Sequence, residues 1–276
     1  MRLRTDLWLT LARAWMVPSD ARFCASFSAD LAADLRAIAR EMGLEAEAVL
    51  REFEESARNL GDPVELQRLY AALFLVPPAP VPLNTGIYLD GTLLGPSERE
   101  LNRVYERLGF RLDPGFRDLA DHPSAQFEVL AALFERAAQA LARGEENAAR
   151  ALLREAGDFL AAYPRRWITP FAAALERSCS ERGYNPCYLW LARFLWLAID
   201  HELVHGEAGW HLEEKVAPRA VEDGNRVLGA EDLAEIAIRL ENAGLSFEHL
   251  RSMPEWKEES YRIRRTLSLK NDREDR

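Results

Sequence analysis

Several features that define whole classes of protein are scarce in this sequence. The 276 residues include only three cysteines, Cys24, Cys179 and Cys187, whose spacing matches no disulfide framework. An odd number of cysteines in a chain of this size is typical of a reducing compartment, so we expect a cytoplasmic protein. Long apolar runs are also missing, because charged residues interrupt the most apolar stretch, Tyr188 to Leu203, and leave it too short to span a bilayer.

Signals for export and for nucleotide chemistry are lacking as well. Asp6 and Arg13 interrupt the first apolar run before any small-residue cleavage site, so we expect the opening segment to form a helix and not a signal peptide. A Walker-type phosphate loop and the dinucleotide-binding glycine pattern are both absent, which leaves nucleotide-dependent catalysis without a motif. A helical, acidic interaction protein of the solenoid kind would show a fixed repeat, and the sequence has none that we can detect.

The charge balance is acidic. Thirty-five Lys and Arg residues against forty-five Asp and Glu residues give a formal net charge of −10. Such a chain repels nucleic acid and anionic membranes and attracts basic peptides, although the same charge also simply keeps a protein soluble.

Helical periodicity runs through most of the chain. Apolar residues recur at spacings of three and four, as in Phe127, Leu130, Phe134, Ala137 and Leu141, and alternating strand patterns are missing. The segment Tyr184 to Val204 is apolar on nearly all sides, which predicts the central helix of a bundle. We therefore predict an all-α protein with one helical-bundle domain at residues 1–214. A linker and helical extension with a frayed tail are expected at residues 215–276.

Two stretches are predicted to be irregular. Val76 to Pro96 contains repeated proline and glycine, which stop helices, and its apolar residues Ile87, Tyr88 and Leu89 predict a loop that packs down. The second stretch, Gly109 to Pro123, joins two predicted helices.

Several dispersed motifs, in order, resemble one family. They are Leu69-Tyr70-Ala71-Ala72-Leu73-Phe74 with Pro77-Pro78, Tyr88-Leu89-Asp90-Gly91, Tyr105, Gly109, Asp121-His122, Phe127-Glu128-Val129-Leu130, Phe159-Leu160, and Trp167 with Pro170-Phe171. This pattern is similar to that of the TorD/DmsD/NarJ family of molybdoenzyme chaperones. The resemblance covers about Leu66 to Glu202. Departures from the family pattern include Gly86, Ala120, Pro123 and Gln126.

The resemblance implies a function without catalysis. It implies a cytoplasmic chaperone that binds the twin-arginine signal peptide and apo form of a molybdopterin-containing oxidoreductase, assists cofactor insertion and proofreads the client before Tat export. It implies no enzyme activity and no cofactor of the chaperone's own. The expected partners are the signal peptide and the catalytic subunit, with no nucleic acid and no stable membrane anchor.

The residues that carry the resemblance also supply candidates for signal-peptide binding. Carboxylates suit the two guanidinium groups of such a peptide, and apolar side chains suit the segment that follows them. The candidates are Asp121, His122, Tyr88, Trp167, Pro170 and Phe171. Asp121 and His122 equally suit a helix N-cap, and the aromatic pattern after Trp167 equally suits core packing.

A competing motif lies near the end of the apolar helix. His201-Glu202-Leu203-Val204-His205 has the H-E-x-x-H form of zinc metallopeptidases, and His211 stands where metzincins place a third ligand. Cys179 or Cys187 would be a less certain fourth ligand. Ala208 replaces the required glycine, and the helical sequence upstream leaves no sheet to hold a substrate. A zinc metallopeptidase is therefore the alternative, and a solvated helix end is the simpler interpretation.

Overall fold

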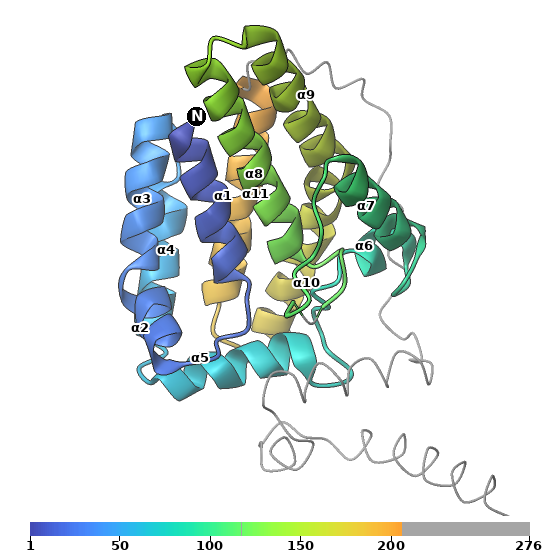
Figure 1. Ribbon diagram of the computed structural model, residues 1–276. Helices are drawn as coiled ribbons and strands as arrows, with labels where there is room; N and C mark the ends of the chain where they lie inside the picture. The colour runs from blue at the N-terminus through green and yellow to red at the C-terminus, as the bar shows by residue number, and fades with distance from the viewer. Residues whose placement is uncertain (117, 206–276) are drawn as a thin grey trace, which may run out of the picture.

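The computed structural model describes residues 1–116 and 118–205 (Figure 1). Over these residues the chain is helical and contains no strand, which confirms the predicted all-α fold. The predicted linker and extension at residues 215–276 lie outside the described residues. No helix within residues 1–116 and 118–205 is both long and apolar enough to cross a membrane.

In chain order, the helices are α1 (Arg2–Ala14), α2 (Ala21–Ala29), α3 (Leu31–Met42), α4 (Glu47–Arg58), α5 (Pro63–Tyr70), the π-helical turn η1 (Ala71–Leu75), α6 (Gly86–Asp90), α7 (Pro96–Arg107), α8 (Pro123–Ala142), α9 (Glu146–Ala162), α10 (Pro164–Arg182) and α11 (Cys187–His205). Short connections join most of the helices, and two longer ones precede α6 and α8.

Local chemistry sets the ends of α5, α10 and α11. The Asp62 carboxylate accepts a hydrogen bond from the backbone N–H of Val64, and Pro63 occupies the first turn of α5, where its missing N–H costs nothing. Gly183 ends α10 with φ of 68°, a left-handed conformation that favours glycine. Asn185 then accepts the N–H of Cys187 and starts α11. The short turn between α10 and α11 makes them antiparallel neighbours.

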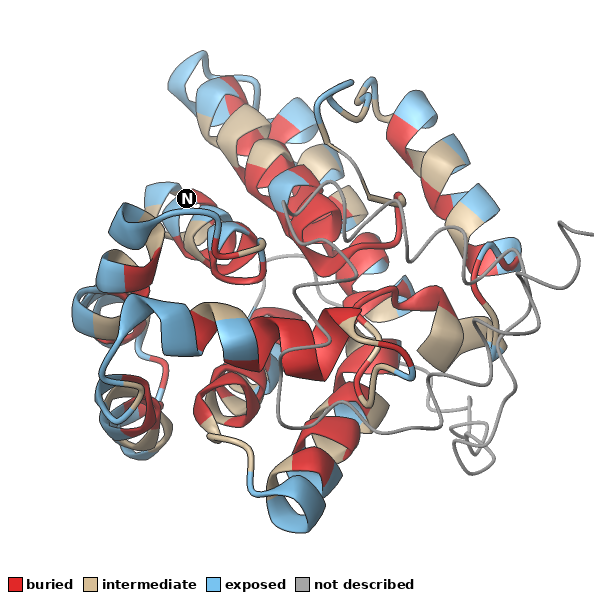
Figure 2. Cartoon of the chain, turned by 90° about the horizontal axis from the view of Figure 1, so that it is seen from below, coloured by how far each residue is buried: buried red, intermediate tan, exposed pale blue. Residues whose placement is uncertain are grey.

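The helix α11 lies inside the bundle, as its apolar sequence predicts. In Figure 1 it runs behind α1 and α8, and it packs against α4, α9 and α10. The ring of Tyr188 has no exposed surface and lies 5.1 to 5.9 Å, between ring centroids, from four other aromatic rings, those of Trp15, Phe27, Tyr70 and Phe74. Figure 2 shows the buried residues on the faces that the helices turn toward one another.

The stretch Val76 to Pro96 differs in one respect from its prediction as a continuous loop. Gly86–Asp90 forms the short helix α6, which packs against α7 and α10. Part of the rest of the stretch is packed down as expected, with Val81 and Leu83 buried, whereas Pro78 and Leu94 are exposed. Tertiary contacts therefore stabilise a helical turn that is too short to be stable alone.

Candidate functional site

Asp121 lies in the interior, at the end of the connection between α7 and α8. Its side chain has no exposed surface. One carboxylate oxygen, Oδ1, accepts a hydrogen bond of 2.9 Å from the Asn84 amide, and the other, Oδ2, accepts one of 2.8 Å from the backbone N–H of Gly86. The carboxylate thus joins the loop before α8 to the start of α6.

The backbone carbonyl of Asp121 is equally engaged. It accepts hydrogen bonds from the Thr85 hydroxyl at 2.9 Å and from the Gln126 amide at 2.8 Å. The same amide donates to the Thr85 hydroxyl, and the Gln126 carbonyl accepts from the Trp167 indole at 3.0 Å. Gln126 is buried, and its side-chain amide both donates and accepts hydrogen bonds, so it links α10 to the Asp121 loop. This residue was not among the predicted candidates.

Gly86 permits the close approach of the carboxylate. A Cβ at this position would stand 2.9 Å from Oδ2 of Asp121 and 3.3 Å from the Ser97 hydroxyl. Tyr105 of α7 also contacts this loop, because its hydroxyl donates a hydrogen bond of 2.8 Å to the Ala120 carbonyl. Burial, and secondarily the charge of Asp121, raise the pKa of Tyr105 well above its ordinary value, so the hydroxyl stays a donor.

His122 caps the helix α8. Its Nδ1 accepts a hydrogen bond of 3.2 Å from the backbone N–H of Ser124, and its ring packs edge-on against Phe116 at 5.8 Å. The imidazole is buried, not on the surface. Of the two predicted uses of the Asp-His pair, the structure shows capping, carried out by His122. Recognition of arginine by Asp121 stays a prediction.

The other predicted candidates cluster around α10. Trp167 and Phe171 have no exposed surface and pack against each other at 5.6 Å. Tyr88 approaches Phe171 edge-on at 5.8 Å, and its hydroxyl donates to the Pro82 carbonyl. Pro170 is half-buried within α10. These residues are neighbours, and Trp167 and Phe171 form part of the core in this state.

A family model described as the nitrate reductase delta subunit matches residues 26–173, which is more than half of the chain. The chain belongs to the nitrate reductase delta subunit family. The resemblance to the TorD/DmsD/NarJ chaperones is thereby confirmed. The family consists of maturation chaperones that act with the catalytic subunits of molybdoenzymes. Searches of the curated proteins and of the solved structures found no significant match.

The H-E-x-x-H motif takes part in structural contacts in this family member. The Glu202 carboxylate is buried and forms an ion pair of 3.0 Å with Arg4, which joins the end of α11 to the start of α1. The rings of His201 and His205 lie 4.8 Å apart. The predicted third ligand, His211, lies outside the described residues, and no group of three potential metal ligands occurs within the part that the structure describes. The metallopeptidase alternative has no support from the family.

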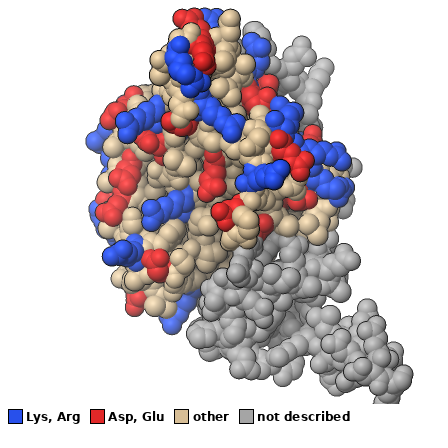
Figure 3. Space-filling view, in the orientation of Figure 1, with Lys and Arg blue, Asp and Glu red and all other residues tan. Residues whose placement is uncertain are grey.

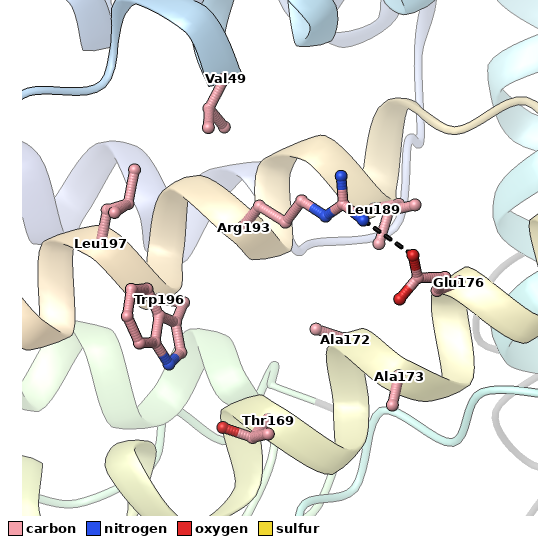
Figure 4. Close-up of a pocket in the computed structure, with 9 residues that line it drawn as sticks. All are labelled: Val49, Thr169, Ala172, Ala173, Glu176, Leu189, Arg193, Trp196 and Leu197. Carbon is pink, nitrogen blue, oxygen red and sulfur yellow. Dashed lines mark hydrogen bonds and ion pairs between the residues drawn. The ribbon is translucent and has the colours of Figure 1, made fainter.

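An apolar groove lies on the outer side of α10 and α11 (Figure 4). Its volume is about 340 Å³. The lining residues come from three helices: Val49 of α4, Thr169, Ala172, Ala173 and Glu176 of α10, and Leu189, Arg193, Trp196 and Leu197 of α11. The α10 residues follow one helical stripe, at spacings of three and four. Two of them are alanines, whose small side chains leave the space opposite a tryptophan and two leucines unfilled.

An ion pair crosses the groove. Arg193 donates to the Glu176 carboxylate at 2.9 Å, with 37% and 62% of the two side chains exposed. The guanidinium of Arg193 also lies 4.4 Å from the ring centroid of Trp190, and that of Arg165 lies 5.8 Å from the ring centroid of Trp196. Since Arg193 has an aromatic partner as well, Glu176 can exchange it for another cation at small cost.

A second hollow, of about 370 Å³, lies between α1 and α3. It is more polar and is lined by Asp6, Leu9, Thr10, Asp34, Ala37 and Ile38. On the face of the molecule shown in Figure 3, acidic and basic side chains are interspersed, so that face has no single sign of charge. On that face, local carboxylates and not a broad field would determine the recognition of a charged ligand.

Proposed function

We propose that this molybdoenzyme maturation chaperone binds the twin-arginine signal peptide of its client in the groove between α10 and α11. It would hold the apo form of a molybdopterin-containing oxidoreductase in the cytoplasm until the cofactor is inserted, and so proofread the client before Tat export. The observation that carries the proposal is the groove itself, an open apolar trough with one exchangeable carboxylate at its side.

The apolar part of a signal peptide suits the groove walls. Such a peptide presents an apolar helix, and helix-in-groove recognition uses small residues on the receptor so that the ligand helix can approach closely. Ala172 and Ala173 provide the small residues, and Trp196, which is 36% exposed, provides a large apolar surface that binding would cover.

The charged part suits Glu176. A guanidinium binds a carboxylate through two parallel hydrogen bonds, which an ammonium group cannot form. One arginine of the signal peptide would replace Arg193 at Glu176, while Arg193 keeps its contact with Trp190. The exposed ion pair of Glu176 contributes only about 0 to 1 kcal/mol, so the exchange meets little resistance.

The predicted site residues support the groove from behind. Trp167 and Phe171 lie on the inner face of α10, and Thr169, Ala172, Ala173 and Glu176 lie on its outer face. The bond from Trp167 to Gln126 continues to the carbonyl of Asp121. In this arrangement Trp167, Gln126 and Asp121 fix the position of α10, and the outer face of α10 contacts the peptide.

Calorimetry with the client's signal peptide tests the proposal. We expect that A173L, which fills the groove with a larger side chain, weakens binding by at least tenfold without loss of stability. E176Q should weaken the binding of the native peptide. It should hardly change the binding of a peptide with two lysines in place of its arginines, because both changes remove the same pairing. Expected losses for E176Q are about 1 kcal/mol or more, because hydrogen bonds to charged groups have that size.

Matched controls separate the groove from the rest of the surface. A132L enlarges a half-buried alanine on α8, and E181Q neutralises an exposed carboxylate on α10, both outside the groove lining. Neither control should alter binding. If A173L and E176Q bind the peptide as well as the wild type does, the site lies elsewhere, and D34N would then test the hollow between α1 and α3.

A further inference from the structure

The sequence contains two pairs of adjacent arginines. The first, Arg165-Arg166, belongs to α10 and is followed by Trp167 and Ile168, which are buried in the core. The second, Arg264-Arg265, lies near the end of the chain, outside the described residues, and is followed by Thr266-Leu267-Ser268-Leu269. Of the two pairs, only the second lies outside the described helices, and like the proposed ligand it has two guanidinium groups followed by apolar side chains.

From this we infer that the chain carries its own imitation of a signal peptide. The segment Ile263 to Leu269 would occupy the groove between α10 and α11 in the absence of a client, with one arginine at Glu176 and the leucines against the alanines of α10. This inference rests on the proposed function and adds a regulation to it: the client peptide must displace the tail.

The tail has the reach that this requires. The groove lining on α11 begins at Leu197 and extends to Leu189, which places it roughly 12 to 24 Å from His205 along the helix axis at 1.5 Å per residue. Residues 206–263 separate the end of α11 from Arg264. An extended chain of that length spans up to roughly 190 Å. Length therefore does not prevent the arginine pair from reaching any part of the groove.

Chemical complementarity selects this segment from the rest of the tail. Binding at Glu176 needs a guanidinium, and the apolar walls need uncharged side chains beside it. Arg273 and Arg276 stand in a run of charged residues without an apolar neighbour. Arg251 is followed by Ser252, Met253 and Pro254, and proline would break a helix lying in the groove. Arg226 and Arg239 also precede apolar residues, but each is a single arginine. Arg264 and Arg265 supply two guanidinium groups within a segment of seven residues that also contains apolar side chains.

Full-length protein provides the test, with the client's signal peptide as the probe. The double variant R264Q/R265Q removes both guanidinium groups of the adjacent pair, and R273Q/R276Q removes the same charge from residues nearby. We expect the first to bind the peptide at least fivefold more tightly than the wild type, because competition within the chain is gone. The second should bind as the wild type does. Equal affinities of all three proteins would overturn the inference and leave the proposed function intact.

A second measurement does not depend on the client. A photoreactive amino acid in place of Ala172 should cross-link within the chain to a peptide that contains residues 263–269, and R264Q/R265Q should abolish this cross-link. Cross-links that never involve residues 263–269 would overturn the inference. A signal peptide that binds to none of the variants would refute the proposed function instead, and the cross-link would still decide whether the tail occupies the groove.

Discussion

Replacing Asp121 by asparagine decides whether this residue holds the fold together or recognises the client. The two side chains have nearly the same shape, so the change removes the charge and one acceptor without opening a cavity. In the structure Oδ1 accepts from Asn84 and Oδ2 accepts from Gly86. An asparagine amide offers one oxygen and one NH₂ group. Whichever way this amide turns, either the Asn84 amide or the Gly86 N–H faces the NH₂ group, which is itself a donor.

The size of the effect follows from those two bonds. A hydrogen bond to a charged group contributes about 1.5 to 3 kcal/mol, and a buried donor left without an acceptor costs about 1 to 3 kcal/mol. These two figures describe overlapping parts of one loss and are not added in full. We expect D121N to lower the free energy of unfolding by about 2 to 4 kcal/mol, measured by urea unfolding followed by circular dichroism.

A control in the same loop isolates burial as the cause. Asp113 is exposed, and its carboxylate accepts a local hydrogen bond from the backbone N–H of Gly115. Asparagine makes the same local bond, so D113N should change the free energy of unfolding by less than about 0.5 kcal/mol. If D121N is as stable as D113N but binds the signal peptide tenfold more weakly, our reasoning is refuted, and Asp121 is a recognition residue in a state that differs from this one.

Other variants give further expected outcomes. Q126E should lower the free energy of unfolding by about 2 to 4 kcal/mol, because a carboxylate cannot donate to Thr85 and to the Asp121 carbonyl. N147D, which makes the same change from amide to carboxylate at an exposed residue, is the control in urea unfolding. The pKa of His201 is lowered by burial and by the charges of His205 and Arg4. The unfolded chain therefore binds the proton more tightly than the folded one does, and the free energy of unfolding falls as the pH drops below about 6.5. H201N should flatten this part of the pH profile of thermal unfolding, and an unchanged profile would count against it. E202Q should destabilise the protein by weakening the contact with Arg4, while elemental analysis should find less than one zinc per chain in both proteins.

Sequence reasoning located the helices well because their signals are local. The stripe from Phe127 to Leu141 predicted a helix that the structure places at Pro123–Ala142, and the apolar segment from Tyr184 to Val204 became α11, Cys187–His205. The start of α11 is set by the cap at Asn185, which the apolar pattern does not contain. The helix α6 was missed because its stability comes from contacts with α7 and α10 and not from its five residues.

The hydrogen-bond network around Asp121 could not be predicted from the sequence, for a different reason. Its partners are far apart in the sequence, as with Asn84 and Asp121, so no local spacing shows that they meet. Gln126 was noted only as a departure from the family pattern, although its amide is suited to donating and accepting at once in a way that an acidic residue is not. The groove depends on where α11 stands relative to α10. The stripe from Thr169 to Glu176 would by itself suit an ordinary solvated face.

The two faces of α10 are open to evolutionary change to different degrees. Substitution of Trp167 or Phe171 on the inner face disturbs the core, so most mutations there are removed by selection for folding. Ala172 and Ala173 on the outer face are half-buried and line the groove, so substitutions there disturb the core less. A lineage can therefore widen or narrow the groove by single mutations and adopt a new client while the motifs that mark its family stay the same. Paralogous chaperones that serve different enzymes would then diverge first along this stripe.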